Sequence, residues 1–270
     1  MLSPLNISDH PGATIRRWLA FTVTAGIVVL IISHYNQALL IGLNNLGREH
    51  NWLWANITSL GDAIVAIAVL ALFARRYPTI IAAALLTAII GTLVIHGLKG
   101  LVQAPRPPVV LGEALNIIGP AHKAGSFPSG HSATAFTLAT IVLLGMKLRW
   151  RWQGALIMGS AALIALSRCI VGVHWPLDVI VGSLIGAATA ALCIYWARRW
   201  RWAASLPGQR ILTLLPILAC ILLPFYDTGY PQAKPLHAVI SLTILTLSWR
   251  QLRLLYLPWH YPLTRHLTDP

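Results

Sequence analysis

The sequence contains few charged residues and very few acidic ones. Only 10% of its 270 residues are charged, and 7 Asp and Glu stand against 20 Lys and Arg. Soluble domains usually carry about 25% charged residues. Because 57% of the residues are also hydrophobic, the composition excludes an ordinary soluble domain and indicates an integral membrane protein.

Cysteines and clustered metal ligands are also scarce. Cys169, Cys193 and Cys220 all fall in or beside apolar runs, which predicts small buried side chains rather than a disulfide framework. No cluster of Asp, Glu and His has the spacing of a metal site, so we expect no metal and no cofactor. The net charge of +13 is spread between apolar runs, so we expect no nucleic-acid partner.

Long apolar runs dominate the chain instead. A membrane-spanning helix needs about 20 mostly apolar residues, and no small-residue cleavage site follows the first run, so we expect that run to be retained. The pattern predicts an all-α transmembrane bundle, a single domain over residues 1–270. The eight expected spans lie near 15–33, 57–74, 79–98, 130–146, 153–172, 176–196, 211–226 and 235–249.

Basic residues predict how this bundle is oriented. Most of them lie in both termini and in the connections after the second, fourth and sixth expected spans. The positive-inside rule places those segments in the cytoplasm. The long 99–128 loop then faces the outside, which in a bacterial inner membrane is the periplasm. The polar 34–56 segment, with its scattered Leu and Trp, favours a helix lying on the membrane surface.

Three polar clusters fall on the outer side of this topology. In the second cluster, Pro128-Ser129-Gly130-His131, the proline suits the first turn of a helix. The free backbone N–H groups of such a helix start bind phosphate, and Gly130 allows close approach of the backbone. Simple capping by Ser129 is the alternative interpretation.

The third cluster joins Ser167-Arg168 to His174 and Asp178. Pro176 predicts a helix start just after His174, with Asp178 at its third position. A carboxylate there can cap the helix, or accept the Nδ1 proton of His174 and leave Nε2 free as a nucleophile. A bound anion would supply a partner for Arg168 at the end of the preceding span.

The first cluster contributes two more cations. Lys99 ends the third expected span, and Arg106 follows Pro105, where the helix is expected to stop. A flexible Lys and a forked Arg suit different phosphate oxygens, although Lys99 could also extend to the membrane interface. The remaining ionisable residues inside spans are Asp62 and His96. For Asp62 we favour helix capping over catalysis, and His96 lies one turn before Lys99, where it could have a structural role near the site.

Together the clusters resemble the signature of the type-2 phosphatidic acid phosphatase superfamily: Lys-x6-Arg-Pro, Pro-Ser-Gly-His and Ser-Arg-x5-His-x3-Asp. The resemblance implies a six-helix core and covers about 57–196 by helix arrangement, whereas the helix pair at about 211–249 is an addition that departs from the family pattern. It also implies a metal-independent site. In that site His174 is the nucleophile, Asp178 orients it, and His131 is the general acid. Phosphate ligands are then Lys99, Arg106, Ser129, Gly130 and Arg168.

The resemblance implies a lipid phosphatase that forms a phosphohistidine. Polyprenyl diphosphate, such as undecaprenyl diphosphate, is the favoured substrate because the clusters lie on the outer side. The alternative substrates are phosphatidylglycerophosphate, phosphatidic acid and lipid A, and the alternative reaction is phosphate transfer between lipids. The sequence does not predict the oligomeric state. A channel or transporter is the non-enzymatic alternative.

Overall fold

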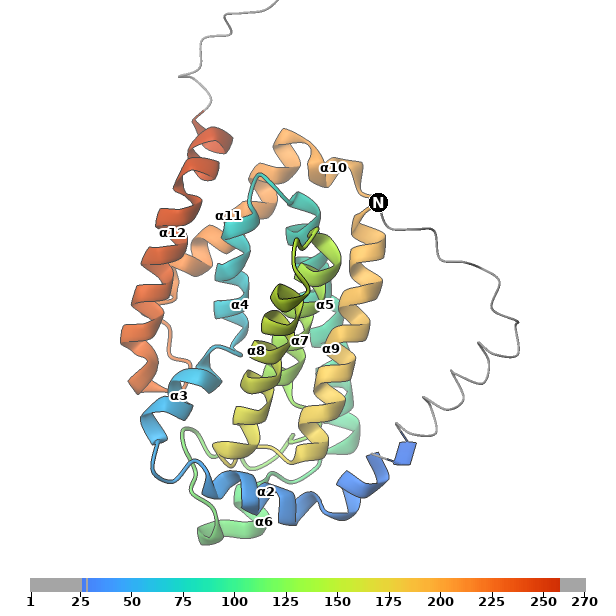
Figure 1. Cartoon of the computed structure of the whole chain (residues 1–270), viewed down its shortest axis with the longest axis vertical. Helices are drawn as coiled ribbons and strands as arrows, with labels where there is room; N and C mark the ends of the chain where they lie inside the picture. Colours follow the sequence, from blue (N-terminus) through green and yellow to red (C-terminus); the bar gives the residue numbers. More distant parts are fainter. Residues whose placement is uncertain (1–25, 28, 258–270) are drawn as a thin grey trace, which may run out of the picture.

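The computed structural model describes residues 26, 27 and 29–257, and within them every regular element is a helix. Four helices of the bundle in Figure 1 pack on one another: α5 (Pro78–Val102), α7 (Gly130–Gly145), α8 (Arg151–Ile170) and α9 (Pro176–Ala197). Beside them lie α4 (Ala63–Val69), α11 (Leu206–Leu222) and α12 (Lys234–Tyr256). The all-α prediction is confirmed.

Fewer helices than expected are long and apolar enough to cross a membrane alone. In the described part of the chain these are the segments Pro78–Ala114, Arg151–Ile170 and Pro176–Ala197. A bent pair, Asn51–Ser59 with Ala63–Phe73, makes a fourth if it counts as one span. Apolar helices α7 and α11 are shorter, and the first expected span falls mostly outside the described residues.

The predicted second span, 57–74, is not one continuous helix. Helix α3 (Asn51–Ser59) ends inside this range, and the chain turns by 60° into α4 and the 3-10 helix η1 (Leu70–Phe73). Asp62 is the N-cap of α4, and its Oδ1 accepts a hydrogen bond of 3.0 Å from the Ile64 N–H. The capping interpretation of Asp62 is therefore confirmed.

Helices α7 and α9 pack so closely that only glycine fits between them. A Cβ atom on Gly182 would lie 2.3 Å from the Ser129 carbonyl oxygen, and one on Gly186 would lie 2.2 Å from that of Ala133. At the end of this contact, the Ser129 N–H donates to the Asp178 carbonyl oxygen at 3.0 Å. Close packing thus joins the second sequence cluster to the third.

The C-terminal helix pair packs on α4 and η1. Val65 and Ala68 from α4 share an apolar cluster with Cys220 from α11 and Ile244 from α12. All three cysteines are buried free thiols, as the sequence predicted. Short helix α10 (Arg201–Ala204) links α9 to this pair, and η3 (Pro231–Ala233) precedes α12.

Two helices lie across the end of the bundle that carries the polar clusters. Helices α2 (Asn36–Asn45) and α6 (Pro107–Leu111) run along the lower end in Figure 1, and the short η2 (Gly112–Ala114) follows α6. Asn44 Nδ2 donates to the Ile170 carbonyl oxygen at 2.8 Å, at the end of α8. Asn36 Oδ1 accepts from the Leu177 N–H at 3.1 Å, at the start of α9. The predicted 34–56 surface helix is thus α2 plus much of α3.

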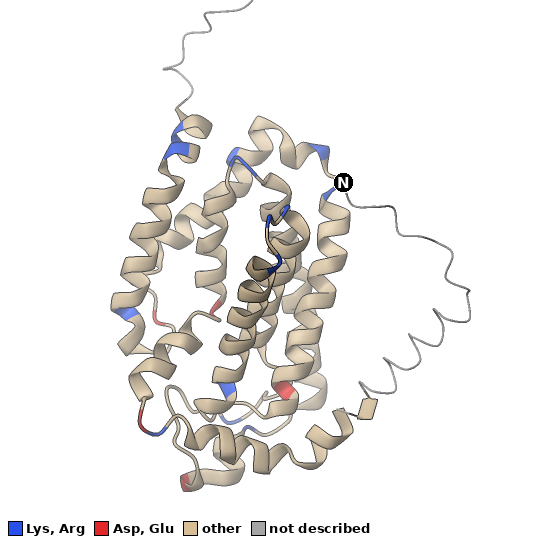
Figure 2. Cartoon of the chain, in the orientation of Figure 1, with Lys and Arg blue, Asp and Glu red and all other residues tan. Residues whose placement is uncertain are grey.

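Most Lys and Arg residues lie near the two ends of the bundle, and few charged residues lie between them (Figure 2). That distribution suits a membrane protein, because burying a charge in hydrocarbon is costly. Which end faces the cytoplasm stays a prediction from the basic residues.

Candidate active site

The three sequence clusters meet at the end of the bundle covered by α2 and α6. Arg106, just before α6, has its Nη1 atom 3.5 Å from His174 Nε2, and it donates to the Val173 carbonyl oxygen at 3.3 Å. Lys99, in the last turn of α5, donates to the Gly125 carbonyl oxygen. Arg106 therefore reaches the turn between α8 and α9, and Lys99 meets Arg106 at the Gly125 carbonyl oxygen, to which Arg106 Nη2 also donates at 3.5 Å.

His174 and Asp178 form a pair at the start of α9. His174 Nδ1 lies 3.3 Å from Asp178 Oδ2. The same oxygen accepts from the Trp175 N–H at 3.0 Å and from the Ser126 hydroxyl. Asp178 thus caps the helix and faces His174 at once, so the two interpretations made from the sequence are compatible. With the Nδ1 proton directed at the carboxylate, Nε2 keeps its lone pair on the Arg106 side.

Burial keeps the His174 ring neutral. Only 2% of the residue's surface is exposed. Burial, and then the charges of Arg168, Arg106 and Lys99, hold its pKa well below the usual value of 6.5. His122 lies in the 99–128 loop, and burial and the Arg106 charge lower its pKa too. A neutral imidazole beside several cations has the form that a nucleophile needs.

The second cluster forms the start of α7. Ser129 is the N-cap: its Oγ accepts from the Ser132 N–H at 3.4 Å and from the Ser132 hydroxyl at 2.9 Å. The capping interpretation of Ser129 is therefore observed. Gly130 follows, with no atom within 4 Å of the place where a Cβ would be. Its backbone therefore stays open to an approaching anion.

Arg168 is buried at the end of α8, with 5% of its surface exposed. Its Nη1 donates to the Thr58 hydroxyl at 2.7 Å and to the Tyr230 hydroxyl at 2.9 Å. Its Nε has no hydrogen-bond partner among the described residues. A guanidinium has five N–H donors, so Arg168 keeps donors for a ligand. No sequence pattern had singled out Thr58, Tyr230 or Ser126.

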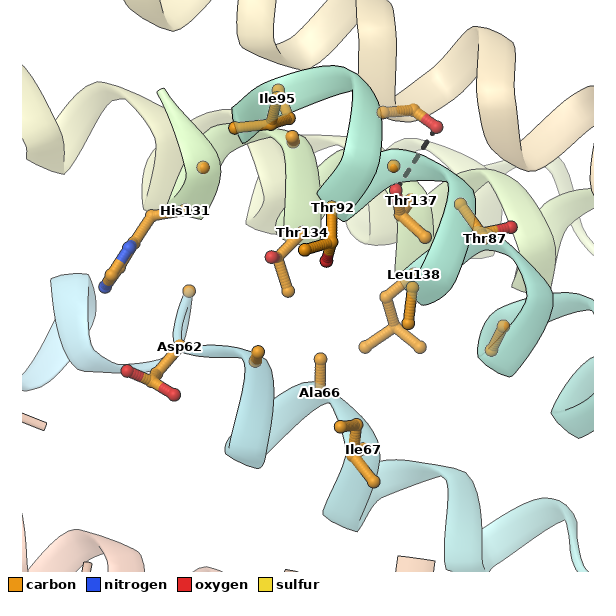
Figure 3. Close-up of a pocket in the computed structure, with 18 of the residues that line it drawn as sticks. Asp62, Ala66, Ile67, Thr87, Thr92, Ile95, His131, Thr134, Thr137 and Leu138 are labelled. Atoms are coloured by element: carbon orange, nitrogen blue, oxygen red, sulfur yellow. Dashed lines mark hydrogen bonds between the residues drawn. The ribbon is translucent and has the colours of Figure 1, made fainter. Parts of the chain in front are cut away.

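A cavity of about 360 Å³ starts beside His131 and runs between α4, α5, α7 and α9. Figure 3 shows the His131 ring and the Asp62 carboxylate at one end, and Ala66, Ile67 and Leu138 farther along. His131 Nε2 is buried and has no partner in the described chain. His96 lines this cavity too. Most of the remaining wall consists of small apolar residues and threonines.

Within the described residues, no group of three or more His, Cys, Asp and Glu side chains could hold a metal ion. The charged groups that meet here are instead three cations and one carboxylate. This set suits an anion with several oxygens, such as a phosphate group.

Comparisons with known proteins agree on one family. The PAP2 superfamily model matches residues 79–202. An undecaprenyl-diphosphatase of Sulfolobus acidocaldarius is 31% identical over 166 residues, which are 60% of this chain and 73% of the relative. A decaprenylphosphoryl-5-phosphoribose phosphatase of Mycobacterium tuberculosis is 32% identical over 56% of this chain and 75% of its own length.

This chain is also similar to a solved structure. The crystal structure of Aquifex aeolicus LpxE is similar with a TM-score of 0.54 and 30% identity, over 59% of this chain and 94% of that one. The matched family segment contains all three polar clusters. This chain therefore belongs to the PAP2 superfamily.

Proposed function

We propose that this PAP2-family membrane lipid phosphatase hydrolyses a polyprenyl diphosphate at the periplasmic face, with His174 as the nucleophile. The observation that carries the proposal is the orientation of the His174 ring. Its Nδ1 lies 3.3 Å from Asp178 Oδ2, while its Nε2 lies 3.5 Å from Arg106 Nη1. Nε2 is thus directed to the place where the cations would hold a phosphate.

The reaction has two steps on this proposal. First, the lone pair of His174 Nε2 attacks the terminal phosphorus, a phosphorus–nitrogen bond forms, and the bond from phosphorus to the leaving oxygen breaks. His131 gives its proton to that oxygen. The first step therefore requires a proton on His131 when the substrate is bound. Water then attacks phosphorus while His131 takes a proton from the water. A phosphorus–oxygen bond forms, the phosphorus–nitrogen bond breaks, its electron pair returns to His174 Nε2, and inorganic phosphate leaves.

The cations and the start of α7 bind the phosphoryl group on this proposal. We assign Lys99, Arg106 and Arg168, with Ser129 and the Gly130 backbone, to its oxygens. Phosphoryl transfer depends mainly on positioning and on stabilising the charge of the transition state. Three cations can supply that stabilisation, so we propose turnover without a divalent metal.

Two observations support a lipid with a long hydrocarbon chain. The cavity beside His131 has walls of small and apolar residues between membrane helices, so it suits an apolar chain attached to the phosphate. Two of the similar proteins are named for polyprenyl-linked phosphates, one from Sulfolobus and one from Mycobacterium. Polyprenyl diphosphate is therefore the substrate we favour.

Relatives also support a second candidate. A lipid A 1-phosphatase of Porphyromonas gingivalis is 37% identical over 73 residues, which are 27% of this chain and 16% of that protein. Phosphatidylglycerophosphatase B of Escherichia coli is 33% identical over 27% of this chain and 30% of its own length. Lipid A and phosphatidylglycerophosphate therefore belong in any substrate comparison.

The test is phosphate release by the purified protein in detergent, with chelator present. A panel of polyprenyl diphosphate, phosphatidylglycerophosphate, phosphatidic acid and lipid A gives kcat/KM for each. We expect the highest value for polyprenyl diphosphate, inhibition by vanadate, and no turnover by His174→Ala. Turnover that stops in chelator and returns with magnesium would contradict the metal-free site, and a higher kcat/KM for another lipid would contradict the substrate.

A further inference from the structure

Arg168 is held by two hydroxyl groups that lie outside the matched family segment. Its Nη1 atom donates to Thr58 at 2.7 Å and to Tyr230 at 2.9 Å. Thr58 precedes residues 79–202 and Tyr230 follows them. Thr58 is fully buried and Tyr230 is 2% exposed. Hydrogen bonds to a charged group are strong where water is excluded, so these hydroxyls fix one edge of the guanidinium.

Packing holds the Tyr230 ring in place. Gly119, at φ +91°, lies so close that an added Cβ would be 2.4 Å from Tyr230 Cε1. The ring also shares an apolar cluster with Val171 and Val173, which belong to the turn between Arg168 and His174. The position of the hydroxyl is therefore set by the loop and by the turn that carry the site.

The same C-terminal segment also stabilises the other partner of Arg168. His237, a fully buried residue of α12, has its Nε2 atom 3.0 Å from the Ser59 hydroxyl, next to Thr58. That hydroxyl donates to the Asn56 carbonyl oxygen at 2.8 Å, so it accepts the proton of His237 Nε2. Helix α12 thereby anchors the end of α3, where Thr58 lies.

We infer that Tyr230 is a positioning residue of the active site, supplied by the segment between α11 and α12. Its hydroxyl holds the Arg168 guanidinium so that the remaining N–H donors point to the transferred phosphoryl group. The inference rests on the proposed function, because that function gives Arg168 its phosphate. The C-terminal pair then completes the catalytic site as well as packing against the bundle.

Tyr230→Phe tests this inference, because it removes the hydroxyl and keeps the ring that packs on Gly119. The matched control is Tyr256→Phe, which removes a hydroxyl of the same helix pair, one that lies 2.7 Å from Thr213 Oγ1. We expect kcat to fall at least about tenfold in Tyr230→Phe, because a hydrogen bond to a charged group is lost. KM should change less than about twofold, and Tyr256→Phe should retain the wild-type kcat.

Thr58→Val is a second variant, for which a similar fall in kcat is expected because it removes the other acceptor. In an Arg168→Ala background, Tyr230→Phe should cause no further loss, since its effect passes through the guanidinium. A further tenfold loss in that background, or a kcat for Tyr230→Phe within twofold of an active wild type, would overturn the inference and leave the proposed function standing.

Vanadate binding to the detergent-purified protein, followed by calorimetry, gives a readout that needs no turnover. We expect about tenfold weaker binding in Tyr230→Phe and unchanged binding in Tyr256→Phe. If the wild type released no phosphate from any lipid, the proposed function would fail. Equal vanadate affinity in the two variants would then also overturn the role of Tyr230.

Discussion

At the scale of single residues, the His174 ring is poised between a carboxylate and a group of cations. Asp178 Oδ2 faces Nδ1 at 3.3 Å, and Arg106 Nη1 faces Nε2 at 3.5 Å. The carboxylate favours one tautomer, and the cations oppose protonation of the ring. Both effects keep a free lone pair on Nε2.

This arrangement predicts activity that persists into mildly acidic solution. Burial and the Arg168 charge lower the His174 pKa from 6.5, and a lowered pKa keeps the ring neutral to lower pH. We therefore expect the acid limb of kcat/KM, which reports the free enzyme, to lie below pH 6.5. The measurement is kcat/KM against pH in detergent, with the substrate's own titration followed by ³¹P NMR. An enzymatic acid limb above that pH would contradict the assignment.

The site residues separate into those that local sequence predicts and those that only the fold brings in. Pro176 and Asp178 identify the start of α9 from the sequence alone, because proline and an acidic residue favour the first turn. Tyr230 lies 62 positions from Arg168, and nothing local links the two. Ser126 was also missed, since a hydroxyl in a loop carries no periodic signal.

At the scale of elements, the cavity between α4, α5 and α7 is the part that would select the lipid chain. Gly91 lines it, and no atom lies within 4 Å of a Cβ placed there. Gly91→Leu should fill part of the cavity. Each excluded CH₂ of the lipid costs about 0.8 kcal/mol, so kcat/KM for a long-chain substrate should fall more than about tenfold.

Gly159→Leu is the matched control, because Gly159 is exposed on α8 and has equally open space around its Cβ position. It should leave kcat/KM unchanged. A short-chain, water-soluble phosphate should be cleaved equally well by both variants. Equal losses on long and short substrates would show that the cavity does not hold the chain.

Helix boundaries were predictable where caps and prolines mark them, and less so elsewhere. Helix α9 starts at Pro176 as expected, whereas α7 starts at Gly130 after the Ser129 cap, so Pro128 lies before this helix and not in its first turn as predicted. The break between α3 and α4 was missed because residues 57–74 were interpreted as one span. The apolar pattern there is interrupted by small or polar residues, namely Thr58, Ser59, Gly61 and Asp62. Single polar residues and a single glycine are nevertheless often tolerated inside a helix.

At the scale of the whole molecule, we propose that the C-terminal pair and the family core form one membrane domain. The Arg168–Tyr230 contact and the shared cluster of Val65, Cys220 and Ile244 support this. Long-range contacts of this kind cannot be read from apolar runs, which give lengths of helices but not their neighbours. Sequence alone therefore could not show which helices belong to the same domain, and the three-dimensional structure was needed.

The orientation in the membrane gives a further prediction for the whole chain. Basic residues near α10 and α11 predict a cytoplasmic location for Gln209 and an outer location for Val109. With a cysteine placed at each position, an impermeant thiol reagent added to intact cells should label position 109 and spare position 209. The buried native thiols serve as the background control. Labelling of position 209 without labelling of position 109 would show that the predicted orientation is wrong.

The central claim is that His174 attacks phosphorus, and trapping the phosphoprotein tests it most directly. Rapid quench with an activated aryl phosphate and with a lipid substrate should yield an acid-labile phosphoprotein in the wild type. His131→Ala should still form it from the aryl phosphate, whose leaving group needs no proton, whereas His174→Ala should form none from either substrate. Peptide mapping should place the phosphate on His174, and phosphoprotein that persists in His174→Ala, or maps to another residue, would contradict the account.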